Sequence, residues 1–282
     1  MSATTSTTTA RAAAETARSH RGTLVRDTPI VAQRNLRRII RQPQIAIFVL
    51  IQPIMFVLLF RYVFGSAIPI PGFDYVQYLM PGIIAQTLVF GSAVTAIGIT
   101  EDLKGGIIDR FRALPMAPGA VMAGRVVADL AVNAVSLVVM LAMGYLVGFR
   151  IVTSVFEGLL ALALLLGLSL AFSWISAVIG LAVKEPEAAQ SAGFIWLFPL
   201  TFISSVFVPT AGMPAPLRFF AENVNPVSHV SNAARALTVD GYLCGTEICT
   251  DPWPPTLWSI AWIVGITAVF LPLSIRLWRR LS

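Results

Sequence analysis

Six long runs of apolar residues, separated by polar segments, dominate the pattern of the chain. A helix rises about 1.5 Å per residue, so about 20 apolar residues are needed to cross a hydrocarbon core of about 30 Å. Each run is near or above that length. The sequence therefore predicts an all-α, polytopic membrane protein with six transmembrane helices, over Ile45–Phe64, Met80–Ile99, Val121–Val147, Phe156–Val183, Ser191–Val208 and Thr256–Ile275.

The basic residues indicate how these spans are oriented. Six crossings place both termini on one side, and sixteen of the twenty lysines and arginines lie on that side. The other side carries Arg61, Arg150, Arg218 and Arg235. Because cytoplasmic loops of membrane proteins are enriched in Lys and Arg, we expect both termini in the cytoplasm and the protein in the plasma membrane.

The composition excludes a soluble enzyme. Charged residues make up 12% of the chain, against about 25% in soluble domains, and 56% of residues are hydrophobic. The net charge of +6 is no sign of nucleic-acid binding, since the basic residues lie at predicted membrane edges, where anionic headgroups explain them. We therefore expect the lipid bilayer, and no nucleic acid, as a partner.

The segment before the first span is divided into two parts. Residues 1–28, rich in Ala, Thr and Ser, are expected to form a disordered cytoplasmic tail without a cleavable signal peptide, and residues 29–282 the transmembrane domain. At 100° per residue, four arginines fall within one helical sector of about 100°, opposite apolar residues. This pattern predicts an interfacial amphipathic helix, which is either a plain anchor or a connector to the first span, carrying Arg34, Arg37, Arg38 and Arg41.

The middles of the six runs contain no ionisable residues. A proton- or ion-driven carrier usually needs such groups within the bilayer, so a secondary carrier is disfavoured. Arg125 and Asp129, four residues apart at the start of the third run, are best interpreted as a local ion pair. The chain has no phosphate-binding loop and no metal motif. We expect no cofactor in this chain, and any ATP must be hydrolysed by a partner.

The loop between the second and third runs has the pattern of a docking helix. Gly105 and Gly106 end the preceding span, and two prolines terminate the segment after it. Ile107, Ile108, Phe111 and Leu114 recur at helical spacing, while three charged residues, Asp109, Arg110 and Arg112, face away. A short helix of this kind is suited to a groove on another protein.

Two stretches resemble a known family. Residues 106–117 (GIIDRFRALPMA), followed by 124–129 (GRVVAD), are similar to the cytoplasmic coupling region of type-2 ABC exporter permeases, in particular daunorubicin-resistance permeases. Residues 207–227 (FVPTAGMPAPLRFFAENVNPV) resemble the pattern of that family between the last two spans. The resemblance covers roughly Pro29 to Arg280.

The resemblance implies a permease that pairs with itself, or with a related permease, and with cytoplasmic ABC ATP-binding subunits that bind ATP and Mg. It gives the amphipathic helix a role as connector, and it makes Glu101 and Asp102 the acidic pair of the family. The residues that it places against the ATPase are Ile107, Ile108, Asp109, Arg110, Phe111, Arg112, Leu114 and Pro115.

The long outer loop, Pro209–Pro255, should contain structure of its own. Pro214–Asn223 and Pro226–Val239 are predicted as two helical stretches, either a re-entrant segment in the outer leaflet or surface helices. The outer-segment residues that we select are Pro214, Phe219, Phe220, Asn225 and Pro226. Cys244 and Cys249 could form a disulfide, and we expect no metal site.

The favoured hypothesis is the transmembrane subunit of an ATP-binding cassette exporter that moves a hydrophobic or amphipathic, drug-like or antibiotic-like compound out of the cell. A permease for a polysaccharide or lipid precursor is the alternative. A membrane-embedded enzyme acting on lipid would need a cluster of nucleophile and base residues near an interface, which the sequence does not display.

Overall fold

The computed structural model describes residues 43–65, 70, 74–105, 118–183, 185–244 and 247–281. Three predicted features lie outside these residues: the tail 1–28, the connector helix with Arg34, Arg37, Arg38 and Arg41, and the docking helix Ile107–Leu114 with Pro115. All three stay predictions from the sequence.

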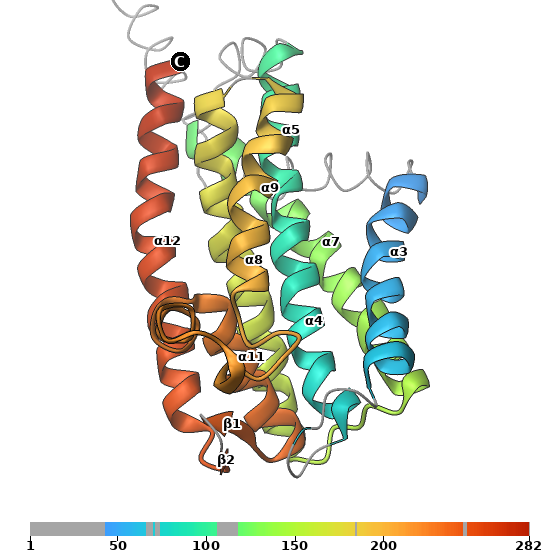
Figure 1. Cartoon of the computed structure of the whole chain (residues 1–282). Helices are drawn as coiled ribbons and strands as arrows, with labels where there is room; N and C mark the ends of the chain where they lie inside the picture. The colour runs from blue at the N-terminus through green and yellow to red at the C-terminus, as the bar shows by residue number, and fades with distance from the viewer. Residues whose placement is uncertain are drawn as a thin grey trace, which may run out of the picture.

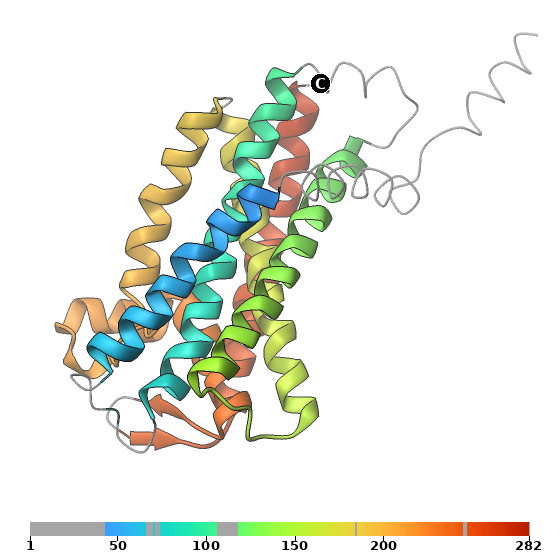
Figure 2. The ribbon, with the colours of Figure 1, turned by 90° about the vertical axis from the view of Figure 1, so that its right-hand side faces the viewer.

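The described part is a bundle of long helices with a small cap at one end (Figures 1 and 2). In chain order the long helical elements are α3 (Pro43–Leu59) with the π-helical turn η1 (Phe60–Phe64), α4 (Tyr75–Ser92), α5 (Val94–Lys104), α7 (Pro118–Val147), α8 (Val155–Val183), α9 (Pro186–Phe202) and α12 (Trp253–Leu281). We call the end that holds the C-terminus the upper end and the opposite one the lower end, as in Figure 1.

The cap lies at the lower end, between α9 and α12 in sequence. Its elements are the 3₁₀ turn η2 (Thr210–Gly212), α10 (Ala215–Phe219), the π-helical turn η3 (Phe220–Val224), α11 (Pro226–Val239) and an antiparallel hairpin of β1 (Tyr242–Cys244) and β2 (Glu247–Cys249). The outer loop thus has structure of its own, and α11 has the predicted bounds because Asn225 caps its start, accepting a hydrogen bond from the backbone N–H of Val227 at 2.9 Å.

Four helical segments are long and apolar enough to cross a membrane: Tyr75–Lys104, Met122–Val147, Val155–Val183 and Trp253–Arg280. α9, with 17 residues, and Ile51–Phe64 are apolar but shorter. Four of the predicted spans are thereby confirmed as helices of sufficient length and apolarity, whereas the count of six stays a prediction.

The bounds predicted for the fifth run, Ser191–Val208, are wrong. α9 begins earlier, with Pro186 in its first turn, and ends at Phe202. Residues 203–208 include Ile203, Val206, Phe207 and Val208, which extended the hydropathy pattern, but the segment is not helical. Several of their backbone carbonyls bond instead to side chains of α4 and α11.

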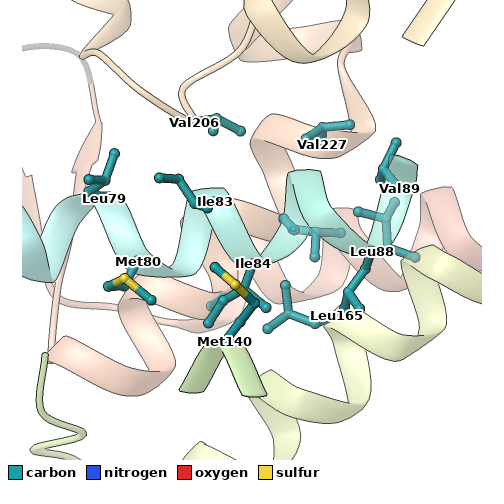
Figure 3. Close-up of a cluster of buried hydrophobic side chains, with 14 of the residues drawn as sticks. Leu79, Met80, Ile83, Ile84, Leu88, Val89, Met140, Leu165, Val206 and Val227 are labelled. Carbon is teal, nitrogen blue, oxygen red and sulfur yellow. The ribbon is translucent and has the colours of Figure 1, made fainter. Parts of the chain in front are cut away.

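α4 and α8 form the centre of the bundle. α8 contacts α4, α5, α7, α9, α11 and α12. Figure 3 shows the cluster around α4, in which Leu79, Ile83 and Leu88 are buried against side chains of neighbouring elements such as Met140 and Leu165. Since lipid tails are as apolar as these side chains, the cluster stabilises the bundle through close packing.

Candidate functional sites

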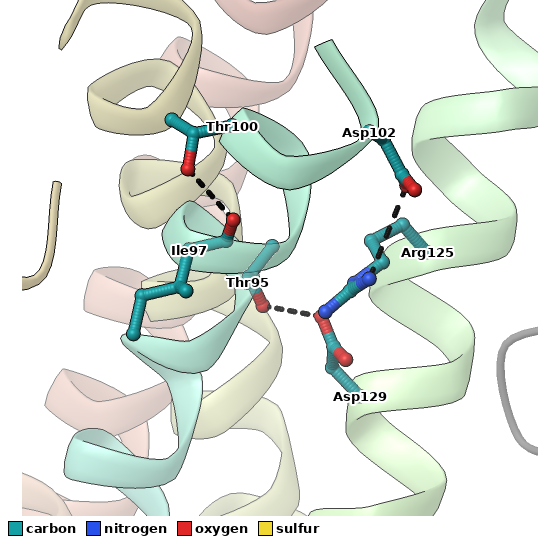
Figure 4. A network of polar contacts seen from close by, with 6 residues as sticks. All are labelled: Thr95, Ile97, Thr100, Asp102, Arg125 and Asp129. Atoms are coloured by element: carbon teal, nitrogen blue, oxygen red, sulfur yellow. Dashed lines mark hydrogen bonds and ion pairs between the residues drawn. The ribbon is translucent and has the colours of Figure 1, made fainter. Parts of the chain in front are cut away.

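A buried ionic cluster joins α5 to α7 (Figure 4), and α5 lies at the upper end of the bundle (Figure 1). The Nε of Arg125 lies 3.1 Å from the Oδ2 of Asp129, and its Nη1 lies 3.9 Å from the Oδ2 of Asp102. Thr95 donates a hydrogen bond of 2.7 Å to the same Oδ2 of Asp129. We call Thr95, Asp102, Arg125 and Asp129 the clasp. The predicted Arg125–Asp129 ion pair is confirmed.

The clasp requires a close approach of the two helices. A Cβ at Gly98 of α5 would lie 1.7 Å from the Nη2 of Arg125, so any side chain at this position would displace the guanidinium. Arg125, Asp102 and Asp129 are all buried. Removing one partner from a buried ionic group leaves an uncompensated charge and typically costs about 3–5 kcal/mol.

The position of the clasp matters because of the segment that it flanks. α5 ends at Lys104 and α7 begins at Pro118, so the clasp fastens together the two helices on either side of residues 106–117. Lys104 also pairs with Glu185, just before α9. That pair is solvent-exposed, and such pairs contribute little to stability. Of the two acidic residues selected from the sequence, Asp102 belongs to the clasp, whereas Glu101 is exposed.

A second polar cluster lies in the cap, around Arg235 of α11. The side chain is 1% exposed. Its Nη1 donates to the Oδ1 of Asn232 at 2.7 Å and to the Oγ of Ser205 at 3.2 Å. Its Nη2 donates to the carbonyls of Ser205 at 2.7 Å and Val206 at 3.2 Å. A Cβ at Gly82 would lie 2.9 Å from this Nη2, so the small residue keeps room for the guanidinium.

Other side chains bind the same irregular segment, residues 203–208. The hydroxyl of Tyr78 donates to the carbonyl of Ser205 at 2.7 Å, and that of Tyr75 to the carbonyl of Phe207 at 3.0 Å. The amide of Asn225 donates to the carbonyl of Ile203 at 2.7 Å and to that of Leu200 at 2.6 Å. We call Tyr75, Tyr78, Asn225 and Arg235 the cap lock. It satisfies backbone groups that would otherwise be unpaired in an apolar surrounding.

The cap lock was not found from the sequence, where Arg235 counts as one basic residue of a polar loop. One signal was present: α11 is rich in small residues, which allow neighbouring backbones to approach closely. The buried small residues of this helix are Ser228, Ser231, Ala233, Ala234 and Ala236.

The selected outer-segment residues divide between core and surface. Asn225 and Pro226 are buried at the start of α11. Pro214 and Phe219 are exposed, and Phe220 is half-buried. Near them Glu222 accepts hydrogen bonds from Thr210 at 2.7 Å and Arg218 at 3.0 Å, which closes α10 onto the preceding turn. Cys249 is disulfide-bonded, and Cys244 of the facing strand is the only other cysteine of the chain.

Comparison with known proteins adds the family. Residues 27–239, which include the clasp and the cap lock, match the family model described as ABC-2 type transporter. The chain is 31% identical over 234 residues to the daunorubicin resistance ABC transporter permease protein DrrB1 of Streptomyces coeruleorubidus, covering 82% of this chain and 78% of that protein. It is 24% identical over 260 residues to the probable doxorubicin resistance ABC transporter permease protein DrrC of Mycobacterium tuberculosis, covering 92% and 90%.

Proposed function

Because the chain belongs to the ABC-2 type transporter family, we propose that it is the transmembrane subunit of an ATP-driven exporter of hydrophobic or amphipathic, drug-like compounds. In this proposal a separate cytoplasmic subunit binds ATP and Mg and hydrolyses the nucleotide. The permease itself contributes the pathway, paired with a second copy or with a related permease.

The cargo class is supported by two observations. The relatives carry the names of daunorubicin and doxorubicin resistance permeases. The mean hydropathy of this chain is +0.79, and the centres of its apolar runs lack charges. A pathway of this composition suits a compound that partitions into lipid better than it suits a small ion, which would need polar ligands at membrane depth.

The observation that carries the mechanism is the clasp. Arg125 joins α7 to α5 through Asp129, Thr95 and Asp102. Residues 106–117 connect these two helices in sequence, and Ile107–Leu114 is the predicted docking helix. An ATPase that displaces that segment would therefore move α5 and α7 together. Because α5 follows directly on α4, which lies at the centre of the bundle, the movement would also reach the centre.

The proposed topology has six crossings, with the upper end in the cytoplasm. α3 with η1 spans Pro43–Phe64, and α9 is continued toward the lower end by residues 203–208, so both can complete a crossing. The cap elements α10 and α11 then form the re-entrant outer segment, and Arg34–Arg41 the interfacial connector before α3. The excess of basic residues on the side of the termini supports this orientation.

Transport in inside-out vesicles tests the proposal. Vesicles that contain the chain and its ATP-binding subunit should accumulate daunorubicin or another drug-like member of a compound panel when ATP is supplied. Vesicles with an ATPase variant that binds but does not hydrolyse ATP are the control. Accumulation of no compound above that control would contradict the proposal, and accumulation of only a lipid-linked sugar would favour a polysaccharide or lipid precursor as cargo.

A further inference from the structure

Eight phenylalanine side chains from separate parts of the chain form one continuous row of ring contacts. The row involves α3 with η1, α4, α9 and the segment 203–208, and successive ring centroids lie 4.8–6.1 Å apart. This range is the one in which aromatic pairs attract each other. We call these rings the phenylalanine track, which consists of Phe194, Phe90, Phe198, Phe202, Phe207, Phe60, Phe56 and Phe64.

The first half of the track follows α9. Phe90 of α4 contacts Phe194 at 5.7 Å and Phe198 at 5.1 Å. Phe198 contacts Phe202 at 5.9 Å, and Phe202 contacts Phe207 at 5.3 Å. α9 runs toward the lower end, and Phe90 lies near the middle of the segment formed by the consecutive helices α4 and α5 (Figures 1 and 2). This half of the track therefore runs from the middle of the bundle to the cap.

The second half crosses to the first helix. Phe207 stacks on Phe60 at 4.8 Å, and Phe60 contacts Phe56 at 6.1 Å and Phe64 at 5.2 Å. Phe207 itself is 3% exposed, and its carbonyl accepts the hydrogen bond from Tyr75. The cap lock therefore fixes the ring that joins the two halves.

Three rings of the track are partly exposed. Phe64, Phe198 and Phe202 are 40%, 43% and 44% exposed. Each therefore presents part of its ring to whatever lies beside the bundle, while the rest packs against the next ring. A planar molecule could stack on such rings without any rearrangement of the backbone.

The phenylalanine track differs from the exposed face of α12. Along α12 the exposed side chains in mid-helix are aliphatic, such as Val264 and Val269, and the exposed aromatic ones, Trp253 and Trp258, lie near its start. That is the ordinary arrangement, with aliphatic side chains against lipid tails and aromatic ones at the interface. Phe90 and Phe194 lie at mid-depth instead, and the track holds eight of the seventeen phenylalanines of the chain.

We propose that the phenylalanine track is the binding surface for a planar aromatic part of the cargo, and that the cargo passes along it from mid-membrane to the lower end. The inference rests on the proposed export function and specifies its substrate class. Each aromatic contact is weak, so a row of similar rings lets a planar group exchange one partner for the next without a single tight site that would retain it.

Binding of daunorubicin, a planar and fluorescent probe, to the permease alone in lipid nanodiscs tests the inference without the ATPase. Leucine keeps most of the apolar volume of phenylalanine but has no ring to stack, so Phe198→Leu combined with Phe202→Leu should weaken binding about 2- to 10-fold per ring removed. Phe156→Leu is the matched control, since Phe156 is 71% exposed on α8 and is not part of the track. It should bind like the wild type.

Two further variants separate stacking from folding. Phe198→Trp with Phe202→Trp restores a planar ring at both positions and should retain binding, whereas a merely structural role would make the larger rings harmful. The size of each nanodisc-embedded variant is measured as well. Loss of dimerisation in the leucine variant, with unchanged binding per chain, would make the track a contact between copies and overturn the inference.

The remaining outcomes are also decisive. Wild-type binding by the double leucine variant, or equal loss in Phe156→Leu, would overturn the inference. A wild-type permease that does not bind daunorubicin, in a complex that nevertheless exports other compounds with ATP, would overturn the substrate class and leave the exporter function standing. Daunorubicin binding to a permease whose complex exports no compound with ATP would instead overturn the exporter function and leave the binding surface standing.

Discussion

The guanidinium of Arg235 lies over the ring of Tyr78, with its central carbon 3.8 Å from the ring centroid, and its Nε donates a 2.7 Å hydrogen bond to the Tyr78 carbonyl. The two residues are 157 positions apart in sequence. This contact fastens α11 to α4. The hydrogen-bond partners of Arg235 are carbonyls, a hydroxyl and an amide, so the buried cation is stabilised by neutral dipoles and by the ring.

The cap should therefore depend on the shape of the arginine, and Arg235→Lys should destabilise the protein by about 2–4 kcal/mol. Lysine keeps the charge but has three donors on a single nitrogen, so it cannot bond Tyr78, Asn232 and the Ser205–Val206 carbonyls together. Thermal unfolding in detergent measures the loss. Arg218→Lys, at the half-buried surface pair with Glu222, is the control and should change stability by no more than about 1 kcal/mol. Equal stability of the two variants would rule out the cap lock.

The clasp predicts a non-additive pair of substitutions. Arg125→Met alone removes the cation that contacts the two buried carboxylates and should cost about 3–5 kcal/mol. Adding Asp129→Leu and Asp102→Leu removes the stranded charges and should recover much of that loss, since apolar replacement of a buried ionic group is often tolerated. Glu187→Gln, at an exposed position in the first turn of α9, is the control and should change stability by about 1 kcal/mol or less. Additive losses would mean that these side chains do not act as one cluster.

The same substitutions should separate stability from coupling. If the clasp transmits movement, the triple variant that carries Arg125→Met, Asp129→Leu and Asp102→Leu should fold but lose part of its ATP-dependent transport. The apolar contact between α5 and α7 is not directional, so it holds the two helices in one relative position less firmly than the ionic contact does. Transport at the wild-type level in this variant would leave the clasp with a structural role only.

Three features of the fold were predicted correctly from short stretches of sequence. Apolar runs of sufficient length became long helices, the helical stretch predicted over Pro226–Val239 is α11, and the i,i+4 spacing of Arg125 and Asp129 predicted their ion pair. These features need only neighbours in the chain.

The features that the sequence did not reveal depend on contacts between distant elements. The end of α9 was missed because four of the six residues 203–208 are apolar and continue the hydropathy of the helix. The groups that bind their carbonyls come from distant parts of the chain, α4 and α11. Arg235 was interpreted as a basic residue of the outer loop because its partners, Tyr78, Ser205 and Val206, are distant in sequence. Within the phenylalanine track, the i,i+4 spacing along α9 and along α3 with η1 is visible in the sequence. The contacts that join these two stripes through Phe207 and Phe90 are not.

The docking helix, known from its sequence pattern alone, can be tested at Phe111. Truncating an aromatic anchor at the centre of an interface costs about 2 kcal/mol or more, so Phe111→Ala should insert normally but fail to retain the ATPase during purification. Phe156→Ala, at an exposed phenylalanine of α8 outside this segment, is the control and should retain the ATPase. Co-purification and substrate-stimulated ATP hydrolysis at the wild-type level in Phe111→Ala would remove residues 107–114 as the coupling element.

The proposed orientation predicts which ends of the chain are accessible from outside. In a background with Cys244→Ser and Cys249→Ser, a membrane-impermeant maleimide added to intact cells should label Thr246→Cys and spare Ser2→Cys. Both sites should react after the cells are opened, which controls for reactivity. The reverse pattern would invert the topology and every role assigned from it.

A histidine in the cap predicts a dependence of stability on pH. His229 stacks on Trp258 of α12, with ring centroids 5.9 Å apart, and burial lowers the pKa of its imidazole below the ordinary value of about 6.5. The unfolded chain therefore binds a proton more readily than the folded one, so this group's stabilising contribution is complete above about pH 6.5 and is lost as the pH falls from there toward the folded pKa. His229→Phe keeps the stack on Trp258 and removes the titration. Unfolding temperatures of the two proteins should diverge below about pH 6.5, with the wild type losing more, and parallel curves down to about pH 5 would show that protonation of His229 does not loosen the contact between α11 and α12.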